Sequence, residues 1–324
     1  MAKTLRAALV GLGNIAWKFD WSKNDLSTPL THAGIYKKIK GVELVAAFSP
    51  DDRERVLAEK ALGIPCFPSL ESMLEQTRPD IVSICSPTEF HFEQVKTCIE
   101  KEVPMIWLEK PPCASLTEQR ALLDYFEELR SPSKIQVNYM RRYMPNYSRL
   151  KDAMKEAKGG VKAILISYSR GIWPNGSHLI DLMSFLMDDH FTYEIKWSGG
   201  GDSENPSSVL RLNGKIEAFI LGLNIPYHCI DIGVIFEDKR LSILHGGLTS
   251  TQESVREHEW FPGFFRLVPE ETFYTSKEDL SKAMELGLLD LIHAHETGGE
   301  LVSNLKTSLM ATKIITEITK WPGP

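Results

Sequence analysis

The chain of 324 residues has few cysteines, no excess of basic charge and no long apolar run. Its five cysteines are widely spaced without a Cys-x-x-Cys pair, which argues against a disulfide framework or a zinc cluster and favours a reducing compartment. A formal net charge of -6 argues against a broad surface for nucleic acid or anionic membrane. No window approaches the ~18–20 apolar residues of a membrane span. We therefore expect a cytoplasmic protein that acts on a small molecule, with no nucleic-acid and no membrane partner.

The rest of the composition is ordinary for a folded globular protein, with 43% hydrophobic and 25% charged residues. At roughly 100–200 residues per domain, the length suggests two domains. An apolar run follows Lys3 and Arg6, as in a secretory leader, but Gly11 and Gly13 interrupt it. We interpret this run as a first strand.

Apolar runs alternate with helical patterns between residues 5 and 138, which is the signature of βαβ units around a buried parallel sheet. A capping box from Ser115 to Glu118 indicates the start of one helix. We therefore expect an α/β Rossmann domain with a parallel sheet over residues 1–130. The expected strands are Leu5–Val10, Glu43–Phe48, Asp80–Cys85, Met105–Leu108 and Ile135–Val137.

The pattern changes after a helix expected at about 145–158. From Val161 onward, several strands are separated by short turns such as Asn213-Gly214, which indicates a mostly antiparallel sheet. Residues 131–296 are thus expected to form an α+β domain with an open sheet. Residues 298–320 have helical spacing, so we expect 297–324 to be a C-terminal helix that packs back on the first domain.

A glycine-rich turn follows the first expected strand. Gly11, Gly13 and Ala16 occupy the positions of G-x-G-x-x-(G/A), the form that lets a pyrophosphate approach backbone N–H groups. The position after an N-terminal strand, within repeated βα units, favours a dinucleotide site over a turn with no ligand. The expected cofactor contacts in this turn are Gly11, Gly13, Asn14 and Ile15.

The end of the second expected strand bears on the choice of cofactor. Asp or Glu at this point binds the adenine ribose and disfavours a 2′-phosphate, but this chain has Ser49 there. Asp51 and Asp52 lie just beyond, with Arg53 as the adjacent cation. NAD and NADP therefore both stay open.

An aromatic and charged stretch, residues 17–30, separates the glycine turn from the next helix. Such a loop beside a cofactor site can cover a substrate. A surface insertion or an oligomer contact explains it equally well.

Two further strand ends carry polar motifs, Ser86-Pro87-Thr88 with His91, and Glu109-Lys110-Pro111. Both lie where open α/β sheets bind ligands, outside the carboxyl edge. With the glycine turn, Asn138–Pro145 and Asn175–Leu182, these segments resemble the glucose-fructose oxidoreductase/inositol dehydrogenase (Gfo/Idh/MocA) family over nearly the whole chain. The motifs are specific together because they occur in the family's order.

This resemblance implies a Rossmann domain that holds NAD or NADP and a second domain that binds sugars or cyclic polyols. Lys110 then orients the reacting hydroxyl and stabilises alkoxide-like charge, and His178 is the candidate acid/base. One position departs from the family: many polyol-oxidising relatives have an aspartate where this chain has Pro174. Further expected cofactor contacts are Ser49, Ser86, Pro87, Thr88, His91, Glu109 and Lys110. Expected substrate contacts are Asp181, Arg142, Asn175 and Tyr139.

Several of these side chains have a second interpretation. His178 and Asp181 are three residues apart on a helix, so Asp181 either orients the imidazole or binds substrate hydroxyls. Arg141 and Arg142 either meet an anionic substrate group such as phosphate or form interdomain ion pairs. His91 either approaches nicotinamide or stabilises its loop. His293 and His295 point apart on a helix, and we expect no metal site.

The sequence thus predicts an NAD(P)-dependent oxidoreductase that transfers hydride between nicotinamide and a sugar-type hydroxyl or ketone, with a sugar phosphate or nucleotide sugar among the candidates. The alternative is a regulator or sensor that binds NAD(P) without chemistry, which the missing carboxylate at Pro174 favours. Lys110 and His178 together argue against it. A homodimer or homotetramer is also expected, since the open sheet offers an apolar face.

Overall fold

The computed structural model describes residues 3–21, 27–157, 159–200, 202–275 and 277–322. The chain divides into two compact units. Unit 1 comprises Met1–Met140 and Lys277–Leu309, and unit 2 comprises Arg141–Ser276 and Met310–Pro324. Within the described ranges, every helix is too short or too polar to cross a membrane.

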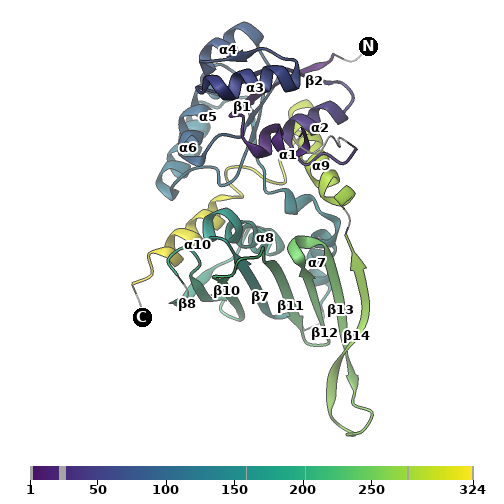
Figure 1. The fold of residues 1–324 in the computed structure, drawn as a ribbon. Coiled ribbons are helices and arrows are strands. Elements are labelled where there is room, and N and C mark those ends of the chain that lie inside the picture. Colours follow the sequence, from purple (N-terminus) through teal and green to yellow (C-terminus); the bar gives the residue numbers. More distant parts are fainter. Residues whose placement is uncertain (1–2, 22–26, 158, 201, 276, 323–324) are drawn as a thin grey trace. The chain divides into compact units, whose positions relative to one another are not determined.

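Unit 1 is built on a six-stranded parallel sheet with the order β3-β2-β1-β4-β5-β6 (Figure 1). The five expected strands are confirmed with shifts of at most one residue at an end, because each is an apolar run buried between two helical layers. The short β3 has no such run and was not predicted. The strands are β1 (Leu5–Val10), β2 (Val42–Phe48), β3 (Cys66–Phe67), β4 (Ile81–Ile84), β5 (Met105–Leu108) and β6 (Lys134–Val137).

Helices cover both faces of this sheet. One core contains residues of α2 and α9 with the first turn after β1, and the opposite core contains residues of α4, α5 and α6. The predicted cap is confirmed: Ser115 accepts a hydrogen bond from the Glu118 N–H at the start of α6. The helices are η1 (Asn14–Lys18), α1 (Phe19–Trp21), α2 (His32–Lys38), α3 (Asp52–Leu62), α4 (Leu70–Thr77), η2 (Thr88–Phe90), α5 (His91–Glu100), α6 (Leu116–Glu128) and α9 (Lys277–Thr297).

Unit 2 is built on an eight-stranded sheet with the order β14-β13-β12-β11-β7-β10-β9-β8. Every neighbouring pair is antiparallel except β10 and β7, so the prediction of a mostly antiparallel sheet is confirmed. The strands are β7 (Val161–Ser169), β8 (Tyr193–Gly199), β9 (Ser207–Leu212), β10 (Ile216–Leu223), β11 (Ile230–Phe236), β12 (Lys239–Leu244), β13 (Thr249–Glu257) and β14 (Phe265–Tyr274).

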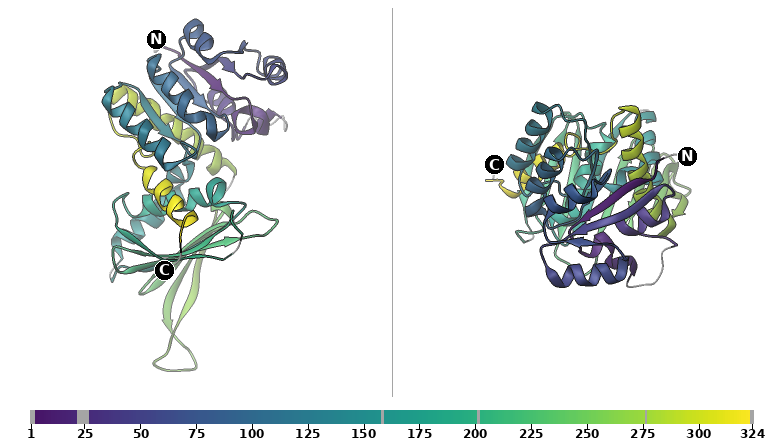
Figure 2. Two further views of the ribbon diagram at one scale, coloured as in Figure 1. Left: turned by 90° about the vertical axis from the view of Figure 1, so that its left-hand side faces the viewer. Right: turned by 90° about the horizontal axis from the view of Figure 1, so that it is seen from above.

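One face of this sheet packs on helices, and the other has no helix over it in the described part of unit 2 (Figures 1 and 2). The helices are η3 (Met140–Tyr143), α7 (Pro145–Glu156), η4 (Ile172–Gly176), α8 (Ser177–Leu186), η5 (His245–Gly247) and α10 (Leu309–Thr319). Leu165 on β7 and its register partner Phe219 on β10 are exposed, whereas Ile164 and Ile166 are buried. The uncovered face is therefore partly apolar.

The unit boundaries differ from the expected 130 and 296. Residues 131–140 join unit 1 because β6 completes the parallel sheet, and α9 joins it because this helix packs on β5 and β6. Helix α10 belongs to unit 2, where Tyr193 donates a hydrogen bond to Glu317 and Ser198 donates one to the Ile318 carbonyl. The expected packing of the whole C-terminal segment on the first domain is thus wrong for α10.

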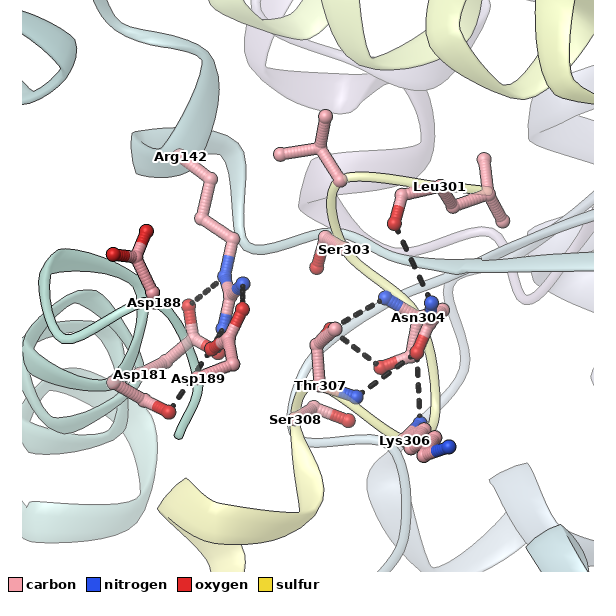
Figure 3. Close-up of polar contacts among 12 residues, drawn as sticks. Arg142, Asp181, Asp188, Asp189, Leu301, Ser303, Asn304, Lys306, Thr307 and Ser308 are labelled. Atoms are coloured by element: carbon pink, nitrogen blue, oxygen red, sulfur yellow. Dashed lines mark hydrogen bonds and ion pairs between the residues drawn. The ribbon is translucent and has the colours of Figure 1, made fainter. Parts of the chain in front are cut away.

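The C-terminal helix is also shorter than predicted. It begins at Leu309, and the preceding residues form an irregular segment in unit 1. The Asn304 side chain accepts hydrogen bonds from the N–H groups of Lys306 and Thr307, which holds a turn in place of a helix (Figure 3). Leu305 packs into the core of unit 1 from this turn. The helical spacing of the leucines therefore indicates that they are buried, although this segment does not form a helix.

Part of the aromatic loop after the glycine turn packs into unit 1. The indole of Trp17 donates to the Leu12 carbonyl and that of Trp21 to the Ala61 carbonyl. Buried Asp20 accepts hydrogen bonds from the Thr31 N–H and hydroxyl. Residues 22–26 lie outside the described residues, so neither interpretation of the loop is decided.

Candidate functional site

The glycine turn after β1 leaves room for a ligand at the carboxyl edge of the unit 1 sheet. Gly11 has φ +82°, and a β-carbon there would lie 2.6 Å from Ser86 Cα, so only glycine fits. A β-carbon at Gly13 would meet nothing within 4 Å, and Gly13 precedes η1 without a side-chain cap. The turn therefore has the close strand approach and the open helix start that a pyrophosphate requires, and these residues fit a dinucleotide. Asn14 is exposed and Ile15 is half-buried beside it.

The two polar motifs after β4 and β5 are joined by His91. Its Nε2 lies 2.9 Å from the Ser86 carbonyl oxygen, and its Nδ1 lies 3.0 Å from the Pro111 carbonyl oxygen. The ring is almost fully buried, at 1% exposure. Burial lowers the pKa of His91, although both carbonyls favour the protonated ring. His91 therefore links the two motifs internally, as its loop-stabilising alternative requires, and its contact with a cofactor stays a prediction. Pro87 is exposed and Thr88 is half-buried at the same edge.

Glu109 lies at the centre of a buried polar network in unit 1. Its Oε1 lies 3.0 Å from His32 Nε2 and accepts a hydrogen bond of 2.6 Å from the Asn138 side chain. The other nitrogen of His32 contacts the Ser83 hydroxyl, which also bonds Tyr36. These contacts fix the carboxylate within unit 1, and the cofactor contact expected of Glu109 stays a prediction.

Lys110 directly follows this anchored residue and is half-buried. The Lys110 N–H donates to Glu109 Oε2 at 3.2 Å. Burial on its own raises the pKa of Glu109, but His32 and the Lys110 charge outweigh it and lower the pKa below its ordinary value. Lys110 thus lies on a rigid turn beside an ionised carboxylate, at the edge that carries the glycine turn.

A carboxylate lies near the end of β2, although Ser49 itself does not provide one. The Ser49 hydroxyl donates a hydrogen bond of 2.9 Å to Glu54 Oε2. Glu54 Oε1 pairs at 3.2 Å with Lys18, which lies in η1 after the glycine turn. Glu54 on α3 is therefore held between the ends of β1 and β2, where a Rossmann fold binds the adenine ribose. The sequence pattern did not indicate Glu54 because this residue lies five positions beyond Ser49.

In unit 2, Arg142 is a buried ion-pair residue (Figure 3). Its guanidinium donates two hydrogen bonds of 2.8 Å to Asp181 and two of 2.9 Å to Asp189. Burial opposes the charge, but the two carboxylates outweigh it and raise the pKa of Arg142. Arg142 and Asp181 thus pair with each other inside unit 2, and their expected role as substrate contacts stays a prediction. The bidentate pair with Arg142 is a contact of Asp181 in addition to the two roles considered from the sequence.

The remaining expected residues are distributed over both units. His178 is buried near the start of α8 in unit 2. Asn175, in η4, donates a hydrogen bond of 2.8 Å to the Ser169 carbonyl. Tyr139 is buried in a core of unit 1, and its expected substrate contact stays a prediction.

The structure also identifies positions that carry no sequence signal. His32 and Asn138 hold Glu109 from α2 and from the chain after β6, far from it in sequence. His32 stands in an apolar helical pattern and Asn138 in a motif with several polar neighbours, so neither could be assigned to Glu109 before the sheet order was known.

Comparison with known proteins finds a family match over part of unit 1. Residues 5–139 match the Gfo/Idh/MocA profile, described as an oxidoreductase family with an NAD-binding Rossmann fold. The chain is 31% identical over 126 residues to D-glucoside 3-dehydrogenase of Escherichia coli, covering 39% of this chain and 32% of that protein. It is 28% identical over 206 residues to inositol 2-dehydrogenase of Corynebacterium glutamicum, covering 62% and 56%. The matched stretches thus span a third to just over half of these relatives.

The fold of the whole chain is similar to solved dehydrogenase structures. Apo scyllo-inositol dehydrogenase from Lactobacillus casei superposes with a TM-score of 0.73 at 17% identity, covering 98% of this chain and 96% of the other. This likeness confirms the predicted fold class, with a parallel Rossmann sheet and a second, mostly antiparallel sheet. The match to the Gfo/Idh/MocA family of NAD-binding oxidoreductases covers residues 5–139, less than half of the chain.

Proposed function

We propose that the protein is a dehydrogenase that transfers hydride between a nicotinamide cofactor and a sugar-type hydroxyl or ketone. The observation that carries this proposal is the position of Lys110, on a braced turn at the sheet edge that also bears Gly11 and Gly13. Relatives named as inositol and glucoside dehydrogenases support a sugar or polyol substrate. Sugar phosphates and nucleotide sugars belong to the same class.

A nicotinamide cofactor would supply the hydride chemistry when bound, and the residues of this chain supply orientation and charge. The backbone of Gly11 and Gly13 would hold its pyrophosphate. The Lys110 ammonium holds the reacting oxygen and stabilises the negative charge that develops on it. His178 exchanges the hydroxyl proton, a role that imidazole performs near neutral pH.

The missing carboxylate at Pro174 does not remove this chemistry. Asn175 follows Pro174, but its amide is bound to a backbone carbonyl and cannot act as a base. Asp181 is bound to Arg142. We therefore assign the proton transfer to His178.

We further propose that NAD is preferred over NADP. Glu54 is fixed by Ser49 and Lys18 at the ends of β1 and β2. A carboxylate there accepts a ribose hydroxyl and repels a 2′-phosphate. The support for NAD therefore comes from Glu54, whereas Ser49 on its own left the choice between NAD and NADP open.

The remaining expectations concern location and assembly. The uncovered face of the unit 2 sheet exposes Leu165, Phe219 and Leu221, which supports a homodimer or homotetramer formed through this face. A cytoplasmic location is supported by the few, widely spaced cysteines of the sequence, because this pattern favours a reducing compartment.

The test is a turnover assay with NAD⁺ and NADP⁺ against a panel of polyols, glycosides, sugar acids and sugar phosphates. We expect NAD⁺-dependent oxidation of at least one compound, and a loss of about 10²–10³ in kcat for Lys110→Met. Lys101→Met, at an exposed ion pair, is the matched control. Unchanged turnover of a confirmed substrate by Lys110→Met contradicts the mechanism.

A further inference from the structure

Two adjacent arginines at the start of unit 2 have opposite environments. Arg142 is matched by two carboxylates. Arg141 is half-buried, and its Nε is shielded from solvent without a hydrogen-bond partner among the residues that the structure describes. Burial lowers the pKa of Arg141, and only Tyr147 counteracts it. Arg141 is therefore a cation whose charge the described chain does not balance.

Tyr147 is the side chain that accompanies Arg141 at this point. This tyrosine of α7 is fully buried, and its hydroxyl interacts with the Arg141 guanidinium. A β-carbon at Gly247 would lie 3.2 Å from Tyr147 Oη. The hydroxyl thus lies beside Arg141 and against a glycine turn.

Two more basic residues, Arg170 and His228, lie close to Ser169 at the end of β7. The Ser169 hydroxyl donates to the Tyr227 carbonyl at 2.8 Å and accepts from the Cys229 N–H at 2.9 Å. These bonds bring Arg170, which follows Ser169, beside His228. Both side chains are exposed. Arg170 also has φ +63°, a backbone conformation that is uncommon for residues other than glycine.

The glycine turn of η5 completes the arrangement. A β-carbon at Gly246 would lie 3.5 Å from His228 Cε1, so the turn lies directly against this ring. Asn146 on α7 donates a hydrogen bond of 2.9 Å to the Gly247 carbonyl. The turn therefore connects the surroundings of Tyr147 and Arg141 to those of His228.

The charges around His228 are mainly positive. Burial lowers the pKa of His228, and the charges of Arg141 and Arg170 lower it further, against Asp231. The Asp231 carboxylate already accepts from the His245 N–H at 2.7 Å and contacts Cys229 Sγ at 3.6 Å. Among the described charges that act on His228, the two arginines therefore outweigh Asp231.

We propose that Arg141, Arg170 and His228 bind an oxyanion carried by the substrate, so that the substrate is a sugar acid, a sugar phosphate or a nucleotide sugar. Guanidinium groups match carboxylate and phosphate oxygens in a bidentate way. This inference rests on the proposed dehydrogenase function for its kinetic part. Ser169 also accepts a hydrogen bond from Asn175, three residues before His178, so the same anchor positions the start of the His178 helix.

Direct binding tests the site independently of turnover. Calorimetry of the full-length protein with glucuronate, glucose 6-phosphate and UDP-glucose, against myo-inositol and methyl glucoside, separates carboxylate and phosphate sources from neutral sugars. We expect anionic compounds to bind at least tenfold more tightly, and Arg170→Met and His228→Asn each to weaken them by about tenfold. Arg170 and His228 are exposed, so these variants are expected to fold. Arg211→Met, at an exposed pair with Glu217, is the control.

Kinetics then separates this inference from the proposed function. Arg170→Met is expected to raise KM about tenfold for an anionic substrate and to leave KM for a neutral one unchanged. Equal binding of anionic and neutral sugars, or anion binding that neither variant weakens, overturns the inference. Anion binding that Arg170→Met weakens, with no turnover of any compound, retains the site and contradicts the dehydrogenase.

Discussion

His32 Nε2 lies 3.0 Å from Glu109 Oε1 inside unit 1, although 77 residues separate the two in sequence. The contact joins α2 to the turn after β5 that carries Lys110. Because both side chains are buried, the hydrogen bond is shielded from water and fixes the direction of the carboxylate. The position of Lys110 therefore depends on a histidine that lies outside every sequence motif.

The first prediction concerns the acid stability of this network. The pKa of Glu109 is lowered from its ordinary value of 4.5, so the folded state holds the carboxylate ionised more strongly than the unfolded state. Its stabilisation is present above pH 4.5 and is lost as the pH falls further, through the folded-state pKa. We expect Glu109→Gln to cost on the order of 1–3 kcal/mol at pH 7 and the difference from wild type to narrow below pH 4.5.

Urea unfolding at several pH values measures this difference. Glu89→Gln, an exposed acid at the same sheet edge, is the control and is expected to change stability by less than about 0.5 kcal/mol. A Glu109→Gln effect that stays constant down to pH 3 contradicts the ionised network.

The second prediction concerns cofactor choice. Removing the charge of Glu54 removes its repulsion of a 2′-phosphate, so Glu54→Gln is expected to shift the ratio of NAD to NADP affinity about tenfold toward NADP, or ~1.4 kcal/mol. Fluorescence titration with NADH and NADPH measures the ratio. Asp52→Asn removes one charge from the same turn of α3 at an exposed position and is expected to leave the ratio unchanged. Equal shifts in both variants assign the effect to general charge and contradict a specific role of Glu54.

The third prediction distinguishes a structural Arg142 from a substrate ligand. Because its partners are buried carboxylates, Arg142→Met leaves Asp181 without its counterion and is expected to cost about 3–5 kcal/mol. Thermal and urea unfolding measure this loss. Arg256→Met, at an exposed pair with Glu270, is expected to cost no more than about 1 kcal/mol. If the Arg142→Met protein is stable but has a strongly raised KM, the result contradicts a structural role and supports the substrate contact predicted from the sequence.

Local patterns in the sequence predicted the elements but not the partners of buried polar groups. The strands of unit 1 follow from apolar runs because burial on both faces requires them, and Ser115 follows from a cap that acts within one turn. The bidentate pair of Arg142 with Asp181 and the bond of His32 to Glu109 depend on which distant elements meet. The spacing of residues along the sequence does not show which distant elements meet.

The same limit explains the error at the C-terminus. Leu301 and Leu305 are buried as a helix would bury them, which is why their spacing indicated one. Asn304 instead forms a side-chain turn with the backbone of Thr307. A single residue that competes for backbone hydrogen bonds therefore changed the local structure without changing the burial pattern.

The last prediction concerns the uncovered face of the unit 2 sheet. Phe219 is 44% exposed and Leu221 is 49% exposed on the same side of β10. Apolar side chains in this arrangement favour association with another copy, since water is released from both faces. We expect Phe219→Glu to shift the protein to monomers in light scattering coupled to size-exclusion chromatography, because an unpaired charge cannot be buried in the interface.

Phe261 provides the matched control for this change. It is 59% exposed in the connection between β13 and β14, where it contacts His258 and Phe264. The hairpin extends beyond the other strands of its sheet (Figure 1). If Phe261→Glu dissociates the oligomer and Phe219→Glu does not, the contact belongs to the hairpin and the sheet face is not the interface. Dissociation by Phe219→Glu alone assigns the interface to the sheet face, because both variants add the same charge to an exposed aromatic position.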